Sequence, residues 1–180
     1  MVTLTSQMAM LNNNWRKRVT ITFKRDELLY DIRNYAWVEG DIMPTKDEHD
    51  RHQVMDVGED GNVDRVARVL DLSFAQCVEL CYPYSKVTVG EETEADDTLN
   101  APATYVLRLR VPDDFAQSTV TLLEKLIHEL LVYKVMADWM SITKPDAKAN
   151  WQEKIQEMET QIVSHLNFRI GRVRRTQAPF

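Results

Sequence analysis

The side chains best suited to metal chemistry lie together in one polar segment. Glu48, His49 and His52 are spaced so that a helix would gather their carboxylate and imidazole groups on one side, and Asp56 follows one turn after His52. A helical metal site of the ferritin type also needs acidic and Glu-x-x-His contributions from several facing helices, but the other predicted helices offer apolar residues. We therefore expect a solvated polar helix here, with no metal and no cofactor.

Other patterns with catalytic potential are incomplete. The segment Asp60–Asp71 begins like a calcium-binding loop, but its sixth position is arginine where glycine is needed and its twelfth is aspartate where glutamate is usual. His128 and His165 lie among apolar helical neighbours without an arranged serine or cysteine nucleophile, and there is no phosphate-binding glycine loop. We expect no catalytic residues and no enzymatic activity. A metal-dependent enzyme that uses the histidine segment stays an alternative hypothesis.

The charged residues are segregated along a chain of 180 residues with a net charge of −6. The first 25 and the last 16 residues contain clustered basic side chains and no acidic residue. The acidic residues concentrate in the middle of the chain. Such segregation suits contacts between copies of one chain or with different partners. The residues expected to bind partners are the charged side chains of the two basic ends and of one acidic segment, with the C-terminal aromatic residue: Arg16, Lys17, Arg18, Glu91, Glu92, Glu94, Asp96, Asp97, Arg169, Arg172, Arg174, Arg175 and Phe180.

The composition predicts one folded domain. Hydrophobic residues make up 44% and charged residues 28% of the chain, while glycine and proline are scarce, which disfavours a loop-rich β protein. Cys77 and Cys81 would share one helical face, a poor geometry for a disulfide, so we expect two buried thiols in a reducing compartment. The segment 1–14 has no continuous hydrophobic region, so neither export nor membrane insertion is expected.

The segment 112–143 predicts a long central helix around which the other elements are arranged. Pro112 suits a first helical turn, and apolar residues then recur every three or four positions. The apolar stripe is wider than one neighbouring helix would cover, so we expect several neighbours. Charged residues such as Glu124 and Lys134 exclude a membrane span.

Three further helices are expected from apolar residues at helical spacing: Asp26 to Gly40, Asn62 to just before Pro83, and Pro145 to Gly171. The central helix should face the second of them, through contacts of Leu126, Leu130 and Val135 with Leu70, Phe74 and Val78. Trp37, Trp139 and Trp151 fall at helix ends or on helical faces, where they either pack in the core or anchor an interface.

Alternating apolar and polar residues predict short strands at 18–24, 86–89 and 103–111. The last two would form a β-hairpin whose tip is the acidic stretch 91–97, and the strand 103–111 has one apolar and one partly basic face. The predicted fold is therefore mainly α: a small helical bundle around a long central helix, with a β-hairpin insertion and extended termini. The single domain comprises an N-terminal arm (1–17), a strand and helices (18–82), the hairpin (83–111), a long helical hairpin (112–171) and a basic C-terminal arm (172–180).

The second half of the chain resembles virion proteins of tailed phages and prophages from Bacteroidetes. The resemblance rests on Pro-Asp-Asp-Phe at 112–115, the long helix, Asp-Trp-Met-Ser-Ile-Thr at 138–143, the proline turn and a closing helix with an arginine-rich end. This arrangement is similar to head–tail connector, or adaptor, proteins. The resemblance implies a homo-oligomeric ring, dodecameric in the family, that sits in the virion neck between portal and tail, and it implies assembly in the cytoplasm of the bacterial host.

A different hypothesis is a helical adaptor or regulatory protein-binding module of non-viral origin, because the residues that carry the resemblance are structural. Sequence-specific binding to nucleic acid is not expected, since the C-terminal arginines are not interleaved with stacking aromatic residues. The expected partners are therefore further copies of the chain, the portal protein, and tail or other neck proteins.

Overall fold

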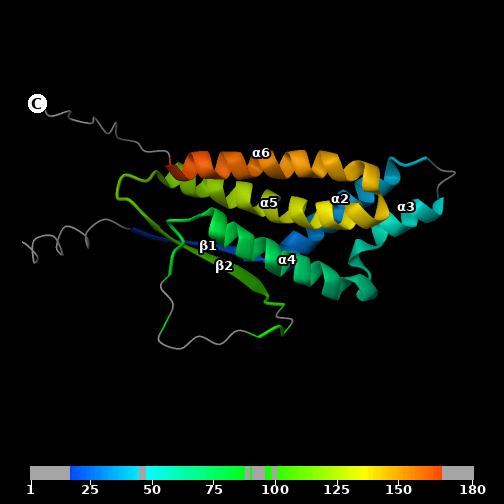
Figure 1. Cartoon of the computed structure of the whole chain (residues 1–180), viewed down its shortest axis with the longest axis horizontal. Coiled ribbons are helices and arrows are strands. Elements are labelled where there is room, and N and C mark those ends of the chain that lie inside the picture. The colour runs from blue at the N-terminus through cyan, green and yellow to red at the C-terminus, as the bar shows by residue number, and fades with distance from the viewer. Residues whose placement is uncertain (1–16, 45–47, 88–89, 91–95, 99–100, 168–180) are drawn as a thin grey trace, which may run out of the picture.

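Helices dominate the computed structural model, which describes residues 17–44, 48–87, 90, 96–98 and 101–167. Figure 1 shows the helices packed side by side with a two-stranded sheet against them. The elements are β1 (Lys17–Lys24), α2 (Arg25–Asp41), α3 (Glu48–Met55), α4 (Asp60–Leu80), β2 (Thr104–Val111), α5 (Gln117–Thr143) and α6 (Lys148–Asn167), with short 3-10 turns at Asp56–Gly58 and Pro145–Ala147. The predicted mainly α bundle is confirmed.

The long helix α5 is the centre of the bundle. It contacts α6, α4, α2, α3 and β1, and α6 runs alongside it after the short turn at Pro145–Ala147 (Figure 1). Twelve of its residues are buried, a larger number than on any other described element, because apolar residues surround most of its circumference. The expectation of a central helix with several neighbours is confirmed.

The start of α5 differs from the prediction. Residues 112–116 form a turn instead of the first helical turn, with a hydrogen bond from the Phe115 N–H to the Pro112 carbonyl, and α5 begins at Gln117. The side chain of Lys17 donates to the carbonyl oxygen of Asp113 at 2.8 Å. In a helix that started at Pro112, the Asp113 carbonyl would point along the helix axis toward the next turn. Here it accepts from Lys17 instead.

The predicted pairing of the strands is wrong. β2 pairs along its whole length with β1, antiparallel, from Lys17 opposite Val111 to Lys24 opposite Thr104. Lys86 and Val87 are not in a strand, and residues 88–89 lie outside the described part. The physical reason is burial: pairing with β1 sets two amphipathic strands side by side, so that their apolar side chains form one continuous buried face, namely Ile21, Phe23, Tyr105, Leu107, Leu109 and Val111.

Helix α4 begins before the expected cap. Asn62 was predicted to cap the helix, but α4 starts at Asp60 and the Asn62 side chain donates instead to the carbonyl oxygen of Asp56 at 2.8 Å. Farther along α4, Cys77 and Cys81 are free and buried, as predicted. The hydrogen bond between the two thiols, together with burial, raises the pKa of Cys77 above its ordinary value, which keeps the thiol protonated.

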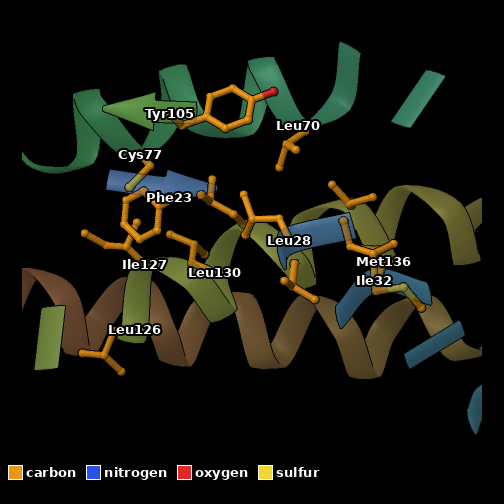
Figure 2. Close-up of a cluster of buried hydrophobic side chains, with 14 of the residues drawn as sticks. Phe23, Leu28, Ile32, Leu70, Cys77, Tyr105, Leu126, Ile127, Leu130 and Met136 are labelled. Carbon is orange, nitrogen blue, oxygen red and sulfur yellow. The ribbon is translucent and has the colours of Figure 1, made fainter. Parts of the chain in front are cut away.

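The core contacts between α4 and α5 follow the prediction in part. Leu70, Leu130 and Val135 are buried in one cluster, whereas Phe74 is partly buried and packs against Tyr105 of β2, with ring centroids 5.1 Å apart. Figure 2 shows Leu126 pointing to the α6 side of α5 instead of toward α4. The difference arises because β2 of the sheet occupies part of the space beside α4, where Tyr105 meets Phe74.

Candidate functional site

The exposed face of the two-stranded sheet is basic. Because side chains alternate across a strand, the residues between the buried ones point away from the core, and there Arg18 lies directly opposite Arg110, with Arg108 opposite Thr20. The three arginines are exposed, and none of them forms an ion pair with a described residue. Like charges directly opposite each other on neighbouring strands repel, so this basic sheet face carries uncompensated positive charge.

Two of the predicted basic contact residues, Lys17 and Arg18, are described, and they begin β1. The Tyr84 hydroxyl lies 3.5 Å from Asn167 Oδ1 at the end of α6, and the carbonyl oxygen of Tyr84 accepts from the Arg110 N–H at 2.8 Å. The start of β1 and the end of α6 therefore lie at the same end of the bundle, beside the basic sheet face (Figure 1). The other predicted residues of the two ends lie outside the described residues: Arg16, Arg169, Arg172, Arg174, Arg175 and Phe180.

The acidic segment predicted as a contact region is described only at its end. Glu91, Glu92 and Glu94 lie outside the described residues, whereas Asp96 and Asp97 are exposed. Asp97 Oδ1 lies 4.0 Å from Arg68 Nη1 on α4. Both side chains are well exposed, so solvent screens the interaction and leaves the Asp97 carboxylate open to partners.

A groove between α2 and α5 gathers acidic residues that the sequence analysis did not single out. It has a volume of about 500 Å³, and its lining contains five carboxylates, one lysine and one histidine along with Tyr30: Asp26, Glu27, Asp31, Glu124, Glu129, Lys125 and His128. His128 Nε2 lies 2.8 Å from Asp31 Oδ2 across the groove. We call this surface the acidic groove. It could not be found from sequence without knowing that α2 and α5, nearly a hundred residues apart, lie side by side.

Hydrogen bonds reach two of the carboxylates of the acidic groove, Glu27 and Glu129. The hydrogen bond from Lys24 lowers the pKa of Glu27, so that this side chain is ionised well below neutral pH. The Tyr35 hydroxyl donates to Glu129 Oε2 at 3.4 Å. Burial raises the pKa of Tyr35, and the charge of Glu129 adds to that effect, so the hydroxyl keeps its proton and remains a donor. The groove therefore has a fixed negative character at neutral pH.

The outer face of α2 carries exposed apolar side chains. Tyr30 and Trp37 are 70% and 55% exposed and lie two helical turns apart on one side of α2, while Val38 and Ile42 are exposed on an adjacent side, Ile42 just beyond the helix end. Tyr30 and Trp37 line a second groove, of about 510 Å³, whose other wall includes Met55 and Glu59. We call the exposed pair Tyr30 and Trp37 the α2 apolar stripe. Contiguous exposed apolar side chains with a tyrosine and a tryptophan are typical of protein-binding surfaces.

The three tryptophans considered in the sequence separate into two roles. Trp139 is buried and donates from Nε1 to the carbonyl oxygen of Val54 at 2.9 Å, which joins α5 to α3. Trp151 is buried between Tyr35 and Tyr133, with ring centroids 5.5 Å and 5.6 Å away. These two therefore belong to the core. Trp37 is the one that can anchor an interface.

The residues considered for metal or calcium binding do not assemble a site in the described structure. Glu48, His49 and His52 are exposed on α3, and His49 Nε2 contacts Gln53 Nε2 at 3.0 Å. Across the described residues, no three His, Cys, Asp or Glu side chains come together in an arrangement that could hold a metal ion. The segment Asp60–Asp71 is helical as part of α4, so its carboxylates do not surround a common centre.

Among the described helices, none has the length and apolar content needed to cross a membrane. No family model, no curated protein and no solved structure matches this chain.

Proposed function

We propose that this chain is a structural virion protein, a head–tail connector that forms a ring in the phage neck between portal and tail. The resemblance of residues 112–180 to connector proteins indicates this role. The helical bundle around α5 is an architecture that suits it. The described surface carries one apolar area and two oppositely charged areas, and each of them could form contacts between subunits.

The observation that carries the proposal is the α2 apolar stripe. Exposed apolar side chains scattered singly are ordinary on a protein surface, but here two large aromatic residues share one side of one helix and line the same groove. Trp and Tyr are enriched among the residues that contribute most to binding, since they bury a large area for little loss of conformational freedom. A partner that covered this stripe would remove it from water.

The separation of different surfaces on one molecule suits a ring. A ring forms when one patch of a subunit binds a different patch of the next and the rotation between them closes. The basic sheet face is made by β1 and β2, whereas the α2 apolar stripe and the acidic groove adjoin each other on α2 and share Tyr30. The two ends of the described chain, Lys17 and Asn167, lie at one end of the bundle (Figure 1).

Replacing Trp37 with glutamate should abolish or strongly weaken self-association while leaving the fold intact. The side chain is 55% exposed, so its loss removes little from the core, but a charge in its place would have to be desolvated at the interface. Sedimentation would measure the assembly, and circular dichroism with thermal melting would check the fold. Val163→Glu, at an exposed apolar position on α6, is the matched control and should assemble normally.

The same variant tests the role in the virion. Particles produced with W37E as the sole copy should contain filled heads that lack attached tails, because the connector would be missing from the neck. Electron microscopy of the lysate would count the two forms. A normal yield of infectious, tailed particles would contradict the proposal that the α2 apolar stripe builds the neck.

A further inference from the structure

The basic sheet face has no acidic partner among the described residues. Arg18 and Arg110 are held directly opposite each other, and Arg108 follows on the same face two cross-strand pairs further along. No described carboxylate lies within ion-pairing distance of these three side chains. The rest of the face is small or uncharged, with Thr20, Thr22, Thr104 and Val106, apart from Lys24 at its end, which pairs with Glu27. An acidic partner would relieve the repulsion between the opposed arginines.

The acidic groove on the same molecule has the complementary charge. Its lining carries five carboxylates against a single lysine, with His128 beside Asp31. Tyr30, which is 70% exposed at the groove, supplies an aromatic side chain that a partner could cover. Within one chain Lys24 of the sheet face pairs with Glu27 of the groove, but no described ion pair reaches the three arginines, which are therefore available for contacts between chains.

We propose that the basic sheet face of one copy docks onto the acidic groove of the next copy. This proposal rests on the proposed self-assembling function and names the surfaces that the assembly uses. The contact is heterologous, because the two patches differ, and a succession of such contacts closes into a ring when the rotation permits. Charge complementarity then fixes which patch meets which and prevents like patches from pairing.

The chemistry of the sheet face favours a protein surface over a nucleic acid as its partner. Non-specific binding of single strands uses aromatic side chains on which bases stack, together with basic residues. The exposed face of β1 and β2 has arginines and threonines but no aromatic residue. A second copy offers carboxylates already arranged in a groove, with which arginine forms strong, geometrically specific hydrogen bonds.

A charge-exchange experiment with full-length chains tests the proposal. The sheet variant is Arg108→Glu with Arg110→Glu, and the groove variant is Glu27→Lys with Glu124→Lys; all four side chains lie at the surface and outside the apolar core. Each variant alone should assemble at least about tenfold more weakly than the wild type, since every contact would join like charges. In a ring with an even number of subunits, such as the dodecamer that the resemblance implies, an equimolar mixture should recover the wild-type mass, because alternating copies restore opposite charges at every contact. Circular dichroism would confirm that both variants fold.

The outcomes separate this inference from the proposed function. If the wild type assembles and the variants assemble equally well at low salt, or if mixing does not restore assembly, the charged contact is wrong while the connector role stands. If the wild type itself never assembles, the role fails and the contact with it. Retention of a DNA oligonucleotide that is lost in the sheet variant, with assembly unchanged, would assign the basic sheet face to nucleic acid instead.

Discussion

Replacing Leu130 with alanine is expected to lower the free energy of unfolding by about 2–5 kcal/mol, the range for a fully buried leucine. Leu130 is completely buried near the middle of α5 and belongs to the cluster that also contains Phe23 and Leu70 (Figure 2). Elements that meet around α5 come from distant parts of the chain. A cavity at Leu130 therefore weakens contacts among the sheet, α4 and α5 at once, and little of it can be filled by local relaxation.

Chemical denaturation of the full chain would measure the effect, with Leu122→Ala as the matched control. Leu122 lies on the same helix, so the change in helix propensity is identical. Its side chain is 39% exposed, so its truncation should lower the free energy of unfolding clearly less. Equal destabilisation by the two variants would show that Leu130 does not occupy the core position assigned to it.

Replacing Trp151 with alanine is expected to cost about 3–5 kcal/mol, the range for a large buried aromatic side chain. Trp151 is 1% exposed and contacts Tyr35 of α2 edge to face, with an interplanar angle of 85°, and Tyr133 of α5 at a tilt. Lys154 Nζ lies over its ring, 4.1 Å from the centroid. The residue thus joins α6 to two other helices, and its removal loses both buried area and the aromatic contacts.

Trp151→Phe is the informative comparison for that site. Trp151 Nε1 is buried without a hydrogen-bond partner in the described part of the chain, so phenylalanine would remove a donor that gains nothing from burial and keep most of the ring contacts. The destabilisation should therefore be clearly smaller than for alanine. A phenylalanine variant as unstable as the alanine variant would mean that the indole nitrogen has a partner that matters.

The helices could be predicted from the sequence because their signal is local. Apolar residues at steps of three and four predicted α2, α4, α5 and α6, and Pro145 predicted the turn between α5 and α6. The ends were harder to predict, since the turn at residues 112–116 takes part in a hydrogen bond from Lys17, far away in sequence. Local patterns carry no information about such a contact.

The sheet and the charged surfaces could not be predicted in the same way. The alternation in 103–111 showed an apolar and a basic face, but a partner close in sequence at 86–89 was as consistent with the pattern as the true partner at Lys17–Lys24. The pairing is decided by which two strands bury a shared apolar face on the helices. Once β1 and β2 are paired, Arg18 and Arg110 become neighbours. Once α2 and α5 are packed, the acidic groove appears.

The mass of the purified full-length chain in solution tests the central claim most directly. We predict that native mass spectrometry or sedimentation at low salt will find one discrete oligomer, a whole multiple of 21.0 kDa, that dissociates as salt rises and charged contacts are screened. The mass itself would give the number of subunits in the ring. A single species of 21.0 kDa at every concentration up to the limit of solubility would contradict the account.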